Sequence, residues 1–130
     1  MPQIPYERVG EYVRTALQIL VENEDSLPSR EVVQKVGQRL SLNEYELERH
    51  EISGQVRWET ILGFYSVSAV KAGWVIKNKG IWYITPEGKD VSVLSNQEYF
   101  DLSEAKYKEW YANQPQKETN TEQLEDVEEI

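Results

Sequence analysis

The sequence predicts an α+β domain that is mostly α-helical, with three helices, a β-hairpin and a further C-terminal helix. Apolar residues recur at helical spacing in several segments, and two short runs rich in β-branched and aromatic residues flank a turn. Ser, Thr, Asn, Pro and Gly mark the ends of these segments. With 130 residues and 39% hydrophobic residues, the chain can bury one core, so we expect one domain over residues 1–113.

The first two helices follow from apolar periodicity. Between Tyr6 and Val21 the apolar residues fall at i, i+4, i+7, i+8 and i+11, namely Val9, Val13, Ala16, Leu17 and Leu20. The polar stretch 22–26 interrupts this pattern. Pro28-Ser29 then offers an N-cap with Glu31 in the first turn, which predicts a second helix that buries Val32, Val36 and Leu40.

The third helix is expected over Arg57–Ala72. Before it, Asn43 and Glu46 have the spacing of a capping box for a short helical turn, and residues 50–55 read as a loop. One stripe of the third helix is predicted to face the core: Trp58, Ile61, Leu62, Tyr65, Ala69 and Ala72. The outward positions are Glu59, Gly63, Ser66, Val67, Val70 and Lys71, and Gly73 is suited to end the helix.

A hairpin should follow directly, because residues 74–76 and 81–84 are β-rich and residues 77–80 read Lys-Asn-Lys-Gly. Its aromatic residues Trp74, Trp82 and Tyr83 are expected on the inner face. Thr85-Pro86 predicts a helix start, and residues 95–98 form a capping box for a last helix over 96–113. The aromatic residues Phe100, Tyr107 and Tyr111 of that helix fit either a dimer seam or docking on the first helix.

The charge of the chain is uneven. The chain has 14 Lys and Arg against 23 Asp and Glu, which gives a net charge of −9. This charge disfavours binding of a phosphate backbone over the whole protein surface. The segment 114–130 has one base, Lys117, against six acids, and we expect an acidic disordered tail there. Residues 52–90 hold five bases against three acids, so a basic patch is compatible with the acidic remainder.

Several classes of site are disfavoured. No cysteine is present, which excludes disulfides and thiolate metal sites, and His50 is the only histidine. We therefore predict no metal site and no cofactor. No apolar run approaches the ~20 residues of a membrane span, and the N-terminus lacks the apolar region of a signal peptide, so we expect no membrane association and a cytoplasmic protein.

Three helices followed by a hairpin is the order of a winged helix-turn-helix, in which the third helix can enter the major groove of DNA and the hairpin lies against the backbone. We therefore predict double-stranded DNA as a partner. The candidate DNA-binding residues lie on the third helix and the hairpin: Arg57, Ser66, Lys71, Lys77, Asn78 and Lys79. For Lys77 and Lys79 a merely solubilising turn is the alternative, and Trp58 fits the core better than a base contact.

The residues also resemble a family. Residues 71–75 read Lys-Ala-Gly-Trp-Val, and residues 79–89 read Lys-Gly-Ile-Trp-Tyr-Ile-Thr-Pro-Glu-Gly-Lys, which is similar to the end of the N-terminal domain of Mrr-type restriction proteins. Residues 27–32 and 40–44 resemble its second helix and the following turn, so the resemblance spans about Tyr6 to Val93. It implies a winged-helix module that binds DNA, in some cases modified DNA, in a restriction system beside a separate nuclease domain or subunit.

Two other classes of function stay open. A protein-interaction or dimerisation adaptor with a winged-helix fold fits the net charge and the aromatic last helix, and makes a homodimer possible. The only sequence features that favour an enzyme are two E-x-K motifs, at Glu87-Gly88-Lys89 and Glu104-Ala105-Lys106. A restriction nuclease uses such a motif to place a carboxylate and a lysine beside a metal ion. Neither lies on an expected strand, so we predict no catalytic residues and no enzymatic activity.

Overall fold

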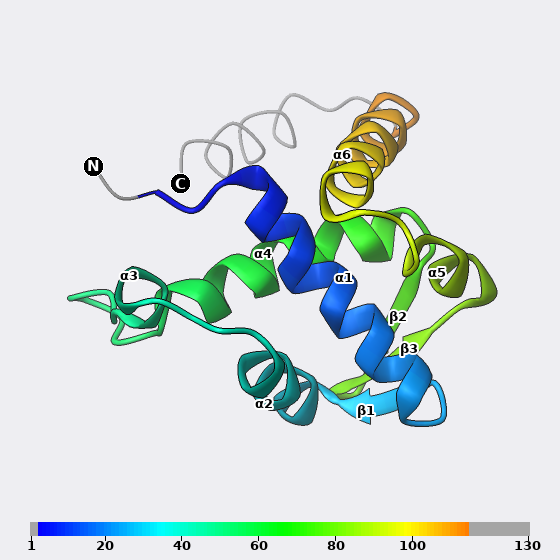
Figure 1. Cartoon of the computed structure of the whole chain (residues 1–130). Coiled ribbons are helices and arrows are strands. Elements are labelled where there is room, and N and C mark those ends of the chain that lie inside the picture. The colour runs from blue at the N-terminus through cyan, green and yellow to red at the C-terminus, as the bar shows by residue number, and fades with distance from the viewer. Residues whose placement is uncertain (1–2, 115–130) are drawn as a thin grey trace.

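The computed structural model describes residues 3–114, which form a mostly helical α+β domain (Figure 1). The elements are α1 (Tyr6–Glu22), β1 (Ser26–Pro28), α2 (Ser29–Arg39), α3 (Glu44–Leu47), α4 (Arg57–Lys71), β2 (Val75–Asn78), β3 (Ile81–Ile84), α5 (Pro86–Val91) and α6 (Asn96–Ala112). The strands form one antiparallel sheet in the order β1-β3-β2. This confirms the predicted fold class, and the order of elements is compatible with a winged helix.

Helix α1 is the centre of the fold. In Figure 1 it crosses the middle of the molecule in front of α4, with α2 and the sheet toward one end and α6 near the other. Its residues Leu17, Ile19 and Leu20 are fully buried. From α4, Trp58 and Leu62 join the same core, as the apolar stripe of that helix predicted. Burial of such apolar side chains is the main favourable contribution to the free energy of folding.

The predicted helix ends are largely confirmed. Asn43 and Ser95 each make a capping box, with Glu46 and Glu98 respectively. The Thr85 side chain accepts a hydrogen bond from the Gly88 N–H at 3.1 Å. Gly73 follows the α4 cap at φ +83°, a conformation that costs little without a Cβ.

The start of α2 differs from the expectation. Ser29 is the first residue of the helix and not its cap, and no side chain caps this end. The preceding residues form β1, a three-residue strand whose Leu27 lies opposite Trp82. Its pairing partner is more than fifty residues away, so no local pattern indicates this strand.

The hairpin turn is tighter than predicted. Asn78 belongs to β2, and only Lys79 and Gly80 form the turn, at φ +52° and +79°. A two-residue turn with both φ values positive is the geometry that fits the twist of paired strands. Trp74 and Trp82 are buried as expected, but Tyr83 was wrongly placed on the inner face. It is 40% exposed, because Trp82 and Ile84 take the inward positions of β3 and alternation turns Tyr83 outward.

Helix α6 packs on α1 and α4. The Phe100 ring stacks on Tyr6 with centroids 4.8 Å apart and lies 5.8 Å from the Tyr65 ring. For Phe100, this supports docking on the first helix over a dimer seam.

The predicted disorder of the acidic segment falls on residues 115–130, outside the described residues. In the described part of the chain, no helix has the length and apolar character needed to cross a bilayer.

Candidate nucleic-acid interface

The candidate interface consists of the solvent-facing side of α4 and the β2–β3 hairpin beside it. The core-facing stripe of α4 is buried or half-buried as predicted, and Glu59, Gly63, Val67 and Lys71 are exposed as predicted. Phe64 also faces solvent, with 42% of its surface exposed. The exposed side of α4 is therefore mostly uncharged.

Ser66 is not on that exposed side, which corrects the prediction. It is only 1% exposed, and its hydroxyl donates to the Gly63 carbonyl at 2.7 Å. The Lys77 ammonium donates to the same Ser66 oxygen at 2.6 Å. The helical pattern placed Ser66 beside the apolar stripe, but it could not show that the hairpin packs against that flank and covers it.

Lys77 faces α4, because it pairs with Trp82 on the inner side of the hairpin. Its ammonium lies 4.5 Å from the centre of the Trp82 ring, a cation–π distance. Burial lowers the pKa of this ammonium below its ordinary value. The residue still has substantial solvent contact overall, so Lys77 adds positive charge to the flank of α4 while its ammonium is anchored by Ser66.

Arg57 lies at the first position of α4 with its guanidinium engaged inside the molecule. It donates to the Tyr45 carbonyl at 2.9 Å and to the Glu48 carboxylate at 2.8 Å, and it stacks on the Tyr45 ring at 3.9 Å. Its side chain is only 20% exposed. These contacts fix α3 to the start of α4, and they leave Arg57 little freedom to reach a separate ligand.

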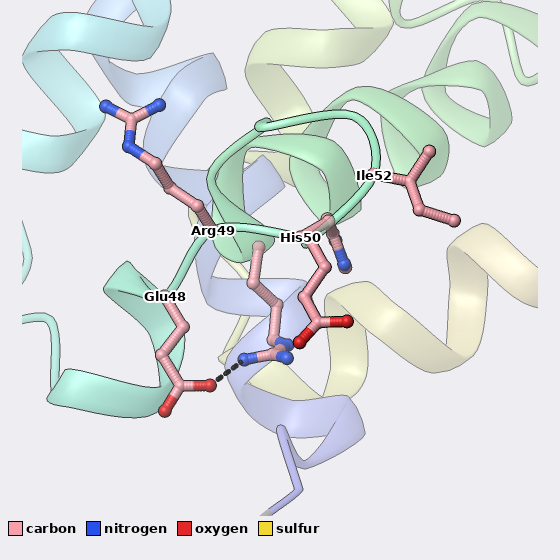
Figure 2. Close-up of a pocket in the computed structure, with 6 residues that line it drawn as sticks. Glu48, Arg49, His50 and Ile52 are labelled. Atoms are coloured by element: carbon pink, nitrogen blue, oxygen red, sulfur yellow. Dashed lines mark hydrogen bonds and ion pairs between the residues drawn. The ribbon is translucent and has the colours of Figure 1, made fainter.

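The segment between α3 and α4 forms a projecting loop. A bridge between Arg49 and Val56 closes it, and the His50 N–H donates to the Gln55 carbonyl at 2.9 Å. An open hollow of about 640 Å³ beside it is lined by Glu48, Arg49, His50, Glu51, Ile52 and Arg57. Figure 2 shows the Glu48–Arg57 ion pair at this hollow. Because the lining carries both charge signs, this hollow does not extend the cationic surface.

Lys71 is at the last turn of α4. Its ammonium lies 4.3 Å from the centre of the Trp110 ring of α6, which is a cation–π distance. The residue is exposed. The aromatic end of α6 thus lies beside this end of the α4 face.

The hairpin tip carries the cation with the greatest freedom at this interface. Asn78 and Lys79 are exposed, and within residues 3–114 Lys79 has no hydrogen bond or ion pair. The Ser29 N–H donates to the Gly80 carbonyl at 2.8 Å, which fixes the tip against the start of α2. Arg30, also exposed and without such a partner in this part of the chain, therefore follows directly beside the tip. The sequence analysis missed Arg30, because only the unpredicted β1–β3 pairing brings it there.

The two E-x-K sequences lie on helices. Glu87-Gly88-Lys89 is in α5, where the Lys89 ammonium pairs with the Asp25 carboxylate at 2.7 Å. Glu104-Ala105-Lys106 is in α6. Over residues 3–114 no group of three or more His, Asp or Glu side chains is arranged to hold a metal ion.

These features define a small α+β domain in which the β2–β3 hairpin flanks the exposed side of α4. The chain belongs to the Mrr N-terminal domain family, whose sequence profile matches residues 10–93. The match runs from within α1 through α5, and confirms the resemblance drawn from the sequence. No curated protein and no solved structure gives a significant match.

Proposed function

We propose that this domain is a non-catalytic module that binds double-stranded DNA within an Mrr-like restriction system. Helix α4 would present its exposed side to the major groove, and the hairpin tip would lie on the neighbouring phosphates. Membership of the Mrr N-terminal domain family supports the association with restriction proteins. DNA cleavage would then come from a separate nuclease domain or subunit.

The observation that supports this proposal most directly is the conformation of Lys79. Its φ of +52° is a conformation that costs roughly 1 to 2 kcal/mol for a residue with a Cβ, and glycine or asparagine normally occupies it in such turns. Within residues 3–114 the lysine side chain makes no hydrogen bond, ion pair or ring contact in return. Backbone strain of this kind is found at binding sites, where the gain is made with the ligand.

Arg30 extends the same surface. It lies in the first turn of α2, an end that has no side-chain cap. Cationic side chains and backbone N–H groups at helix starts are common phosphate ligands in DNA complexes. With Lys79 beside it, Arg30 would allow two phosphates to be held from two different elements.

The charge balance of this side supports the same conclusion. Arg30, Lys71, Lys77 and Lys79 are the cations of the hairpin, the start of α2 and the exposed side of α4, and the acids there are Glu31 and Glu59. The chain as a whole has a net charge of −9, so most of its acids lie outside this surface. A local cationic surface can attract a polyanion even when the protein as a whole is acidic, and salt weakens the attraction.

The test is a fluorescence anisotropy titration of labelled duplexes at low salt, with matched methylated and unmethylated DNA. We expect binding that weakens as salt is added. The variant Lys79→Ala should bind more weakly, and Lys106→Ala, which removes an exposed cation from α6, should bind as the wild type does. Equal loss in both variants would mean that binding reflects total charge and not this surface.

A second candidate function is a protein-interaction adaptor, and the outer face of the sheet favours it. On that face Ile76 lies opposite Tyr83, and they are 54% and 40% exposed. Pro28 lies opposite Ile81, so this face of the strands bears four apolar side chains and no charge. Exposed apolar surface of this kind is typical of interaction sites. A homodimer detected by light scattering and lost in Ile76→Ser would support this function.

A further inference from the structure

The exposed side of α4 lacks the side chains that usually read bases by hydrogen bonds. Bidentate recognition of guanine or adenine uses Arg, Lys, Asn or Gln. Lys71 is the only one of these on the exposed side, and its ammonium lies over the Trp110 ring. The Ser66 hydroxyl is buried and bonded within the protein, and Arg57 is held by Glu48. Thr60 has its hydroxyl bonded to the Val56 carbonyl and the Gln55 side chain.

The middle of that side is apolar instead. Phe64 and Val67 are 42% and 41% exposed, although each sits on a well-formed helix beside the core. Gly63 lies next to them, and a methyl group added there would meet no atom within 4 Å. A glycine in a helix interior costs about 1 kcal/mol relative to alanine, and no packing contact with residues 3–114 requires it at this position. It leaves room for another surface to approach the helix backbone closely.

We propose that α4 recognises the 5-methyl group of thymine in the major groove, through Val67 and Phe64 with Gly63 allowing close approach. This inference rests on the proposed DNA binding and specifies the chemical group that the exposed side of α4 recognises. Among the unmodified bases, thymine alone offers an apolar group at the edge of the major groove, and apolar side chains contact that methyl. The cations that flank the face, Lys71 and Lys77, favour DNA as the occupant. A second copy of the chain is disfavoured, because two partly exposed side chains fall far short of the ~800 Å² that each partner of a stable dimer buries.

The experiment compares one random-sequence duplex pool copied with either thymidine or deoxyuridine triphosphate, which differ only in the 5-methyl group. All cytosines are unmethylated, so thymine is the only source of this group. Burial of one methyl corresponds to about a fourfold change in affinity. We expect wild-type protein to bind the thymine pool about fourfold more tightly for each methyl contacted. Val67→Ala and Phe64→Ala should bring the ratio of the two affinities close to one.

The control variant is Val93→Ala, which removes an apolar side chain that is 80% exposed between α5 and α6. It should keep the wild-type preference for thymine. Equal binding of the two pools by the wild type would overturn the inference and leave DNA binding intact, whereas failure to bind either pool would overturn the proposed function itself. A dimer that Val67→Ala dissolves would also overturn it, since a second copy would then cover this face.

Discussion

At the scale of single residues, the most constrained group is the Glu46 carboxylate, which is buried between α1 and α3. It accepts hydrogen bonds from the Arg8 guanidinium at 2.8 and 3.1 Å and from the Tyr12 hydroxyl, and it completes the capping box with Asn43. Burial acts to raise the pKa of this carboxyl, but the hydrogen bonds from Arg8, Tyr12 and Asn43 lower it below 4.5 overall. The Glu46 carboxylate is therefore a buried charge that is surrounded by hydrogen-bond donors.

We predict that Glu46→Gln lowers the free energy of unfolding by roughly 3 kcal/mol, because Arg8 would lose its carboxylate partner in a partly buried site. Urea denaturation measures the change. Glu22→Gln is the matched control, since it breaks an ion pair with Arg39 whose side chains are 42% and 51% exposed, and it should cost less than about 1 kcal/mol. Equal losses in the two variants would contradict the structural importance of Glu46.

The same carboxylate makes the stability pH-dependent. Since its pKa is lower in the folded than in the unfolded chain, its contribution is present above about pH 4.5 and is lost as the pH falls through the folded value. The stability difference between wild type and Glu46→Gln should therefore shrink below pH 4.5. Denaturation curves at pH 7 and at pH 3.5 give the measurement, and a difference that stays constant would count against this assignment.

Lys79 gives a prediction in which stability and binding change in opposite directions. Lys79→Asn should raise the free energy of unfolding by roughly 0.5 to 1 kcal/mol, because asparagine tolerates the φ of +52° better. It should also weaken DNA binding, because it removes the phosphate contact proposed for Lys79. Thermal unfolding and anisotropy on the same preparation measure both effects. A variant with unchanged affinity would indicate an ordinary turn lysine.

At the scale of elements, the two glycines of the long helices α1 and α4 have opposite roles. A Cβ at Gly10 of α1 would collide with the Asn96 carbonyl of α6 and lie 3.0 Å from the Phe100 Cβ, whereas at Gly63 of α4 it would meet nothing within 4 Å. Gly10→Ala should therefore destabilise the domain by roughly 1 to 3 kcal/mol through overpacking, and Gly63→Ala should stabilise it by roughly 0.5 to 1 kcal/mol. Calorimetry of both variants checks the pair, and destabilisation by Gly63→Ala would contradict the open face of α4.

The elements also show what the sequence could and could not predict. Capping boxes at Asn43 and Ser95 and the glycine after α4 are local signals, and the structure has them where they were expected. Strand β1 was missed because its partner is distant in sequence and its three residues have no periodicity. The misplacement of Ser66 has a similar cause, since helical periodicity finds the core-facing stripe but not the flank that a hairpin covers.

At the scale of the whole molecule, positive and negative charge are separated. The hairpin, the start of α2 and the exposed side of α4 carry more bases than acids, while the chain carries a net charge of −9. The sequence indicated this uneven distribution. It could not indicate which bases are engaged inside the protein: Arg57 and Lys77 have partners, whereas Arg30 and Lys79 have none among the described residues. The fold was therefore easier to predict than the site.

In the proposed complex, Lys79 and Arg30 hold DNA phosphates. The measurement that tests it most directly is the salt dependence of duplex affinity for the wild type and for Lys79→Ala and Arg30→Ala. The logarithm of the binding constant should fall linearly with the logarithm of salt concentration, and each variant should reduce the slope by about one contact. Absence of binding at about 50 μM protein in low salt, or slopes unchanged in both variants, would contradict the account.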